Sequence, residues 1–394
     1  MAKVSNLGEK YTPMYFLASL GSGGLAVSFF LYLNFLIPHK GVEMVSITHI
    51  MPFLQKGNFV SFLIAIAILI TFFFIFKHFE LLFWNIKEYG FFKKSIGFEK
   101  LKRTNSEVSL MAIPLTIGMS MNIVFILLAL TLPILYDVIE YLLPVALVSF
   151  LVIGFFALKI YIEYFSHMII SGDFKANENN NFSQLIAIFA FAMISVGFSG
   201  PGAMSSNITV SSIGIFFAVF FAIVAISLTF IKIILAMREI LESGISKETS
   251  VSIWIMLPIL TLLNIAFIRL TFGFYHHLVN DSVPSAWLFL ITSSIFSLEL
   301  IFAVVGYFVM KKLGYFKDYI NGDKKSNLSF AIICPGVAFY VLGFFFIMAG
   351  LVKNNIITIF SPQFFIILAI LVFVQYKTVR TFFKLEKKLI KQHA

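Results

Sequence analysis

Residues 59–77 read FVSFLIAIAILITFFFIFK, an uncharged apolar run that ends at Lys77. A helix needs about 20 mostly apolar residues to cross a bilayer, and this run reaches that length. Runs of the same kind fill most of the chain. We predict ten membrane spans, at residues 14–37, 58–79, 108–134, 141–168, 183–204, 208–236, 251–272, 285–310, 328–350 and 358–380. The sequence therefore predicts an all-α integral membrane protein with ten transmembrane helices.

The composition favours the same class. Hydrophobic residues make up 60% of the chain and charged residues 12%, with a mean hydropathy of +0.97, whereas soluble domains carry about 25% charged residues. No stretch between the runs is long enough for a soluble domain, so we expect one transmembrane domain over residues 1–394. The single cysteine, Cys334, lies inside the ninth run, which excludes an internal disulfide. The first run is longer than the apolar part of a signal peptide and lacks a cleavage site after it, so we expect an uncleaved helix.

Positive charge is distributed unevenly between the loops. Of the 29 Lys and Arg residues, all except Lys40, Lys56, Arg269 and Lys353 fall on the side of the predicted spans that holds the two termini. Cytoplasmic loops carry an excess of Lys and Arg, which predicts a multi-pass plasma membrane protein (inner membrane in a bacterium) with both termini in the cytoplasm. The net charge of +10 is then explained by topology and by anionic lipid headgroups. No nucleic acid partner is predicted.

Lysines mark the cytoplasmic ends of the even-numbered spans, at Lys77, Lys159, Lys232, Lys311 and Lys377. Their roughly even spacing favours an internal repeat of five helical hairpins, at about residues 11–90, 105–170, 182–240, 250–315 and 326–385. A lysine is common at any cytoplasmic helix end, so the spacing alone leaves the repeat open.

Helix breakers favour the repeat independently, because they concentrate in the odd-numbered spans. They are Gly21, Gly23, Gly24, Pro114, Gly118, Gly197, Gly200, Pro201, Gly202, Pro258, Pro335 and Gly336. Proline removes a backbone donor and clashes with the preceding turn, and in lipid the freed carbonyls must find partners in protein or in a water-filled cavity. We therefore expect five kinked inner helices, surrounded by five smooth outer helices that face lipid. The axis of such a ring could hold a pore.

Several local sequences resemble a known family of transport proteins. They are Tyr11-Thr-Pro-Met-Tyr-Phe-Leu-Ala-Ser-Leu-Gly21, Ile113-Pro114, Ile215-Phe-Phe-Ala-Val-Phe220, Met256-Leu-Pro258 and Cys334-Pro335. In this order and architecture the chain resembles the tellurite-resistance/dicarboxylate transporter family, which includes the bacterial TehA channel, plant slow-type anion channels, yeast malate permease and fungal sulfite exporters. The resemblance implies five hairpins around a central pore, a homotrimer, and small anions as the transported species.

The resemblance also implies a gate. In channel members of the family a phenylalanine of the ninth helix closes the pore, just before a proline. Here Cys334 stands before Pro335, with Phe330 about one turn earlier and Phe339 about one turn later. Phe330 and Phe339 are therefore the gate candidates.

Polar side chains within the odd-numbered spans are candidates for the pore lining. They are Ser19, Ser22, Thr116, Ser120, Asn122, Ser195, Ser199, Thr261 and Asn264. Hydroxyls and amides can replace part of the hydration of an anion without trapping it. Small polar residues also allow close packing of helices, so both interpretations stay open. The breakers Gly21, Gly24, Pro114, Gly197 and Pro258 join the pore candidates because they lie in the same spans.

Charged residues near or inside the spans each have two interpretations. Arg269 could attract anions at the outer mouth, or its head group could reach the membrane interface. Glu299 lies in the middle of the eighth span, where an ionised carboxylate is costly; it is either a proton-coupling site or a structural polar contact. Glu80 and Glu163 are expected to pair with Lys77 and Lys159 at helical spacing.

The sequence contains no P-loop, no G-x-S-x-G, no H-E-x-x-H and no Cys/His cluster. His276 and His277 have no further ligand at a suitable spacing. We therefore predict a protein that is not an enzyme and has neither a cofactor nor a metal site. The predicted function is a channel or permease for small anions. A proton-coupled or exchange carrier for C4-dicarboxylates or sulfite is the alternative, and a non-conducting membrane sensor is a third.

Overall fold

The computed structural model describes residues 3–39, 42–102, 104–171 and 184–391. Three basic residues of the charge pattern (Lys40, Arg103 and Lys175) and the first residue of the predicted span 183–204 lie outside these ranges. Within them, every regular secondary-structure element is a helix. The predicted all-α class is therefore confirmed.

Ten helical segments of the described chain are long and apolar enough to cross a membrane. They are Pro13–Leu36, Phe59–Phe92, Asn105–Thr131, Leu135–Ile170, Leu185–Met204, Ile208–Ser243, Thr249–Val279, Ser285–Leu313, Asn327–Val352 and Pro362–Leu389. Each coincides with one of the predicted spans. By length and composition the chain is a multi-pass membrane protein.

Alternate spans differ in burial. The inner helices are α1 (Phe16–Leu36), α5 (Ala112–Thr131), α7 (Leu185–Met204), α9 (Met256–Phe274) and α11 (Ile333–Phe345). The outer helices are α3 (Phe59–Phe92), α6 (Leu135–Ser171), α8 (Ile208–Ser243), α10 (Ser285–Leu313) and α12 (Pro362–Leu389). Between 61% and 100% of the apolar window is buried in the inner spans, against 17% to 39% in the outer spans. The expected difference between odd-numbered and even-numbered spans is confirmed.

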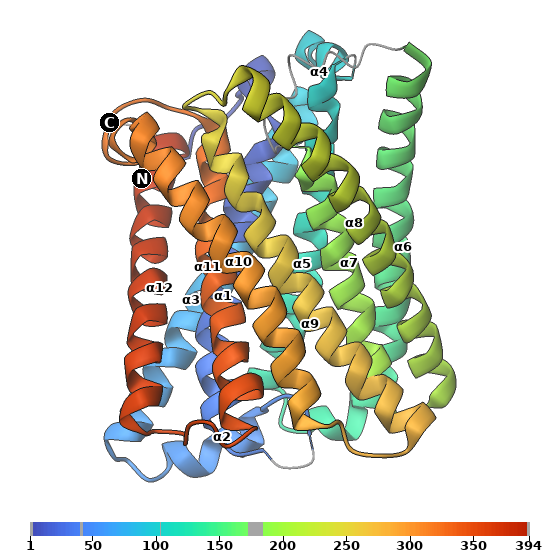
Figure 1. Ribbon diagram of the computed structural model, residues 1–394, viewed down its shortest axis with the longest axis vertical. Coiled ribbons are helices and arrows are strands. Elements are labelled where there is room, and N and C mark those ends of the chain that lie inside the picture. Colours follow the sequence, from blue (N-terminus) through green and yellow to red (C-terminus); the bar gives the residue numbers. More distant parts are fainter. Residues whose placement is uncertain (1–2, 40–41, 103, 172–183, 392–394) are drawn as a thin grey trace.

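The inner helices form a closed ring. Each one packs against the next in chain order, from α1 to α5, α7, α9 and α11, and α11 packs against α1. Each outer helix packs against the inner helix that precedes it in the chain. Figure 1 shows both chain termini and the short helix α4 (Ile96–Leu101) at one end of the bundle, and α2 (Ile47–Leu54) at the other. We call these the terminal end and the α2 end; the inner helices all run from the first to the second.

Three of the four prolines among the predicted breakers lie at the starts of inner α-helices, whereas Pro201 lies in the last turn of α7. Pro114, Pro258 and Pro335 are each the third residue of α5, α9 and α11. Each helix follows directly on a 3₁₀ segment, η3 (Asn105–Met111), η5 (Thr249–Ile255) or η8 (Asn327–Ile332). The first turn of an α-helix tolerates proline because its N–H groups lack α-helical partners. In these three inner spans the helix changes from 3₁₀ to α geometry just before the proline, where we predicted a kink in the middle of the span.

Close backbone contact joins three helices near the α2 end. A Cβ atom on Gly273 of α9 would lie 2.3 Å from the carbonyl oxygen of Gly202 in α7, and one on Gly214 of α8 would lie 2.7 Å from the Gly202 nitrogen. Small residues at such crossings let helix backbones approach in membranes. These glycines therefore set the spacing of α7, α8 and α9.

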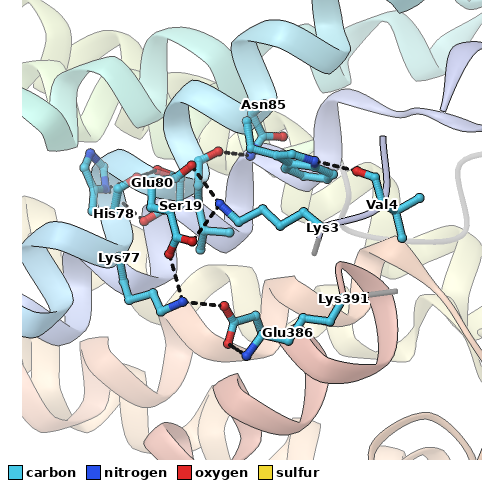
Figure 2. Close-up of polar contacts among 11 residues, drawn as sticks. Lys3, Val4, Ser19, Lys77, His78, Glu80, Asn85, Glu386 and Lys391 are labelled. Atoms are coloured by element: carbon cyan, nitrogen blue, oxygen red, sulfur yellow. Dashed lines mark hydrogen bonds and ion pairs between the residues drawn. The ribbon is translucent and has the colours of Figure 1, made fainter. Parts of the chain in front are cut away.

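At the terminal end, the two ends of the chain are held together. The Val4 N–H donates to Ile390 O at 2.8 Å, and the Trp84 indole N–H donates to Val4 O at 2.8 Å. A chain of ion pairs lies beside them (Figure 2) and links Lys3, Glu80, Lys77, Glu386 and Lys391 at 2.8 to 3.1 Å. We call these five residues the terminal clasp.

The two predicted helical ion pairs are present. Lys77 and Glu80 lie 2.8 Å apart within the clasp. Lys159 and Glu163 lie 4.0 Å apart on the exposed face of α6. Both predictions are confirmed.

Candidate functional site

A cavity of about 540 Å³ lies inside the ring, and all five inner helices line it. The inner helices contribute residues Val27–Phe35 of α1, Met119–Ile126 of α5, Met193–Met204 of α7, Leu262–Phe272 of α9, and Val341–Phe345 of α11 with the π-helical segment η9 (Phe346–Val352) that follows it. The outer helices α6 and α10 add Leu143, Ala146, Phe150 and Leu288, and the segment before α2 adds Val42, Glu43 and Met44. The inner helices all run toward the α2 end (Figure 1), so these lining residues place the cavity in that half of the bundle. We call it the central cavity.

Three charged side chains line the central cavity: Arg269, Lys353 and Glu43. The Arg269 Nη1 donates to Val196 O at 3.2 Å. The absence of a side chain at Gly200 leaves room beside it, since a Cβ there would lie 3.9 Å from Nη1. The Lys353 Nζ lies 4.9 Å from the centre of the Phe272 ring. Among the described residues, neither cation has a carboxylate within 4.0 Å.

Surrounding protein perturbs the two charged groups that lie outside the spans. Glu43 precedes α2 and lines the cavity with an exposed side chain. Nearby protein atoms reduce the hydration of its carboxyl, which raises the pKa of that group. The positive charge of Arg269 acts in the opposite direction and lowers this pKa. The same loss of hydration lowers the pKa of the Lys353 ammonium. Two cations and one carboxylate give the cavity a positive balance.

Most of the remaining wall is apolar. Its aromatic and thioether side chains are Phe30, Phe35, Phe125, Phe150, Phe272, Phe345, Met44, Met119, Met193, Met204 and Met348. The two uncharged amides of the wall are both used within the protein. Asn34 Oδ1 accepts from Val45 N–H at 2.9 Å, and Asn122 Nδ2 lies 3.3 Å from the Met193 sulfur. Asn34 thereby holds the segment that carries Glu43.

Toward the terminal end, each inner helix continues beyond the residues that line the cavity. In each inner helix, the residue four positions before the innermost wall residue lies on the same helix face as that wall residue. These five residues are Gly23, Leu115, Phe189, Pro258 and Val337. All are buried except Val337, which is half-buried. None of the five lines the cavity. We call them the closing layer, and the Phe189 ring is its largest member.

Of the predicted pore residues, the central cavity contains Asn122, Gly197 and Arg269. Gly197 admits a ring from an outer helix, because a Cβ there would lie 2.1 Å from the Phe150 ring. The other predicted residues are not part of the wall: Gly21, Gly24, Pro114, Ser120, Pro258, Asn264, Glu299, Phe330, Cys334, Pro335 and Phe339.

The two gate candidates lie away from the cavity. Phe330 is fully buried in η8, at the terminal end, with its ring centre 6.4 Å from that of Tyr15. Phe339 points to the outer helix α10, where its ring centre lies 5.7 Å from that of Phe296. Cys334 is buried in the first turn of α11.

Gly21 and Gly24 of α1 serve the contact with α11. A Cβ on Gly21 would lie 2.8 Å from the Ile333 side chain, and one on Gly24 would lie 3.1 Å from the Val337 side chain. The two glycines thus allow close approach of neighbouring inner helices.

Several predicted pore hydroxyls are used for contacts between helices. The Ser22 hydroxyl donates to Phe74 O of α3 at 3.0 Å. The Ser195 hydroxyl donates to Ala218 O of α8 at 2.8 Å. The packing alternative therefore describes these side chains better than a pore lining.

His78 of α3 is a buried polar residue that we did not predict. Its Nδ1 lies 2.9 Å from Ser19 O in α1, and its Nε2 lies 2.8 Å from the Ser120 hydroxyl in α5. The imidazole therefore joins three helices, and Ser120 serves this contact. Its place after Lys77, at the end of a predicted span, suggested a membrane interface rather than a core position.

Glu299 lies between helices rather than in the central cavity. Its Oε2 accepts a hydrogen bond from the Thr261 hydroxyl of α9 at 3.1 Å, and the same hydroxyl lies 3.2 Å from Ala338 O of α11. The Glu299 Oε1 and the side-chain amide of Asn264 lack hydrogen-bond partners within the described part of the chain. The hydrogen bond from Thr261 favours the interpretation of Glu299 as a structural polar contact.

His276 and His277 lie in the π-helical segment η6 (Tyr275–Val279) that follows α9. The His277 Nε2 lies 2.8 Å from Ser205 O. No group of three or more His, Cys, Asp or Glu side chains in the described ranges could hold a metal ion.

Comparison with protein-family models, curated proteins and solved structures found no match to the chain.

Proposed function

We propose that the protein is a membrane channel or permease that conducts small anions along the axis of its inner helices. The central cavity carries the proposal, because all five inner helices line it and because it holds Arg269 and Lys353 against the single carboxylate of Glu43. A cavity with apolar walls focuses the field of its charges and concentrates ions of the opposite sign. Its positive balance therefore favours anions over cations.

The family resemblance agrees with this proposal. It suggests a TehA-like protein that works as a homotrimer in the plasma membrane, or the bacterial inner membrane, with both termini in the cytoplasm. In that orientation the central cavity faces the outside and the closing layer faces the cytoplasm.

The closing layer is the proposed gate. Phe189 is buried and lies four residues before Met193 in α7, so we place its ring on the same helix face, next to the floor of the cavity. The family resemblance suggested the ninth helix for the gate, but Phe330 packs against Tyr15 and Phe339 against Phe296. We therefore assign occlusion to Phe189 together with its neighbours in the layer.

The full-length protein in liposomes tests the proposal, with chloride, nitrate, sulfite and succinate fluxes measured separately. We expect Phe189→Ala to raise chloride or nitrate flux at least about tenfold, equal to a barrier lower by about 1.4 kcal/mol. Phe191→Ala is the matched control. Phe191 is also buried in α7, but its ring packs against Tyr161 of α6 and Phe221 of α8, neither of which lines the cavity.

Two results would contradict the channel. Folded Phe189→Ala protein that passes none of the four anions would favour the non-conducting sensor. Equal increases in Phe189→Ala and Phe191→Ala would place the occlusion elsewhere.

The second candidate is a proton-coupled carrier for dicarboxylates or sulfite, and the unpartnered Oε1 of Glu299 favours it. The same liposomes separate the two functions. A channel keeps its flux and pH profile in Glu299→Gln, because the Thr261 hydroxyl can donate to an amide oxygen as it does to the carboxylate. A carrier loses uptake driven by a pH gradient in that variant.

A further inference from the structure

We propose that the central cavity binds organic anions with an apolar body, namely monocarboxylates with a short aliphatic or aromatic chain, whose carboxylate contacts Arg269. This inference rests on the proposed function, because it names the anion class of the same cavity.

The first observation is the apolar wall. An inorganic anion must give up hydration on entering, and a polar or charged group is costly to bury unless new hydrogen bonds replace the lost water. Uncharged side-chain donors in this wall are few: the Asn122 Nδ2 lies 3.3 Å from the Met193 sulfur, and Asn34, whose Oδ1 accepts from Val45 N–H, offers only its Nδ2. An anion with an apolar body brings surface that gains by leaving water and meeting this wall. The methionines among the wall residues adapt easily to ligands of different shape.

The second observation is the free capacity of Arg269. A guanidinium carries five N–H donors in a planar fork that matches a carboxylate. In the described part of the chain, its single hydrogen bond runs from Nη1 to Val196 O. Gly200 leaves open space beside the group. The remaining donors can therefore meet a carboxylate inside the cavity.

The third observation is the depth at which the guanidinium lies. It contacts α7 between Val196 and Gly200, whereas the wall of α7 extends from Met193 to Met204. Below this level the wall includes Met193, Val27 and Leu262. A carboxylate at Arg269 thus leaves an apolar floor for the body of the ligand. A volume of about 540 Å³ lies within the range of ordinary small-molecule sites.

Binding to the purified full-length protein tests this inference without any need for transport. Sodium benzoate, hexanoate, acetate and chloride, and uncharged benzyl alcohol, are titrated by calorimetry and by thermal unfolding. We expect benzoate and hexanoate to bind at least about tenfold more tightly than acetate, chloride or benzyl alcohol. Charge-assisted hydrogen bonds supply the preference for the anion, and apolar burial supplies the preference for the longer body.

Two variants and one control assign the site. Arg269→Gln is expected to weaken benzoate binding at least about tenfold. Arg238→Gln is the matched control, because Arg238 is an exposed arginine of α8 paired with Glu242 at 2.9 Å, and it should bind as the wild type does. Should Arg269→Gln fail to fold, Val27→Phe fills the floor instead. That variant should lose hexanoate binding and keep weak acetate binding.

The inference is overturned if acetate or chloride binds as tightly as benzoate, if benzyl alcohol does so, or if Arg269→Gln or Val27→Phe binds like the wild type. Failure of this inference is distinguishable from failure of the proposed function. Chloride flux in Phe189→Ala without benzoate binding would sink the ligand class and leave the channel. Selective benzoate binding without any anion flux would support the ligand class and contradict the channel.

Discussion

Glu43 brings a carboxylate into a central cavity that also holds Arg269 and Lys353. Surrounding protein raises the pKa of this carboxyl above its ordinary value, so Glu43 takes up a proton at a higher pH than a solvated glutamate does. Its protonation removes the one negative charge among the three groups. At the residue scale, the field that acts on an entering anion is therefore sensitive to mild acidification.

We expect anion flux through Phe189→Ala protein to rise as the pH on the cavity side falls from neutral through the raised pKa of Glu43. Adding Glu43→Gln should raise the flux at neutral pH severalfold and flatten this profile, because steering by a cleft charge changes entry rates by about tenfold or more. Liposome flux at a series of pH values provides the measurement. The control is Glu242→Gln, on the exposed surface of α8. An unchanged profile in the Glu43 variant would exclude the carboxyl as the titrating group.

At the scale of elements, Gly273, Gly202 and Gly214 fix how closely α7, α8 and α9 approach. A Cβ on Gly273 would meet a backbone carbonyl, which cannot turn aside as a flexible side chain can. We expect Gly273→Ala to lower the free energy of unfolding by about 2 kcal/mol, the usual cost of overpacking. Thermal unfolding in detergent measures the change.

Gly90→Ala is the matched control for this prediction. Gly90 lies in α3 with no atom within 4 Å of the added Cβ, so alanine should be neutral or stabilising by up to about 1 kcal/mol. If the two variants show the same change in the free energy of unfolding, the absence of a side chain at Gly273 does not determine the stability of the contact between α7 and α9.

Much of the arrangement of elements could be predicted from the sequence. Apolar length identified all ten spans, and the breaker pattern identified which helices are inner ones. The ends of the outer helices were missed, since α3 continues to Phe92 and α12 to Leu389. The α12 extension carries Glu386, which pairs with Lys77 of α3, and the α3 extension carries Glu80, which pairs with Lys3 near the start of the described chain. A charged stretch of this kind is hard to tell from a loop without those partners.

The candidate site was less predictable, for a physical reason. Inner helices are apolar on every face, because both the cavity wall and the contacts with outer helices are apolar. The sequence therefore has no periodic signal that identifies the face toward the axis. Arg269 could be predicted because basic residues are rare at the α2 end of the spans. Lys353 is another of these rare basic residues. Ser120 and Phe339 were placed on the axis but face His78 and Phe296.

At the scale of the whole molecule, the terminal clasp joins the first and last described residues of the chain. Glu386 of α12 pairs with Lys77 of α3 at 2.8 Å and with Lys391 at 3.0 Å, and its side chain is only 1% exposed. Removing one partner of a buried ion pair is costly because the other charge stays buried. The clasp therefore contributes to holding α12 against α3.

We expect Glu386→Gln to lower the free energy of unfolding by about 2 kcal/mol, less than for an isolated buried pair because Lys77 keeps Glu80 as a partner. Glu163→Gln is the control, because its pair with Lys159 is exposed and 4.0 Å long; the expected loss there is below about 0.5 kcal/mol. Chemical or thermal unfolding in detergent compares them. Equal losses would show that the clasp adds nothing beyond a surface pair.

The polar contact between α1 and the outer helix α12 bears on biosynthesis. The Tyr32 hydroxyl donates to Gln375 Oε1 at 2.8 Å, and Gln375 Nε2 donates to the Ser28 hydroxyl at 2.9 Å. Tyr32 and Ser28 belong to α1 and are synthesised before Gln375, which belongs to α12. Until α12 has been made, the polar groups of α1 that contact it lack these partners. The contact can form only after α12 has been inserted, so loss of the hairpin of α11 and α12 leaves the bundle open along α1.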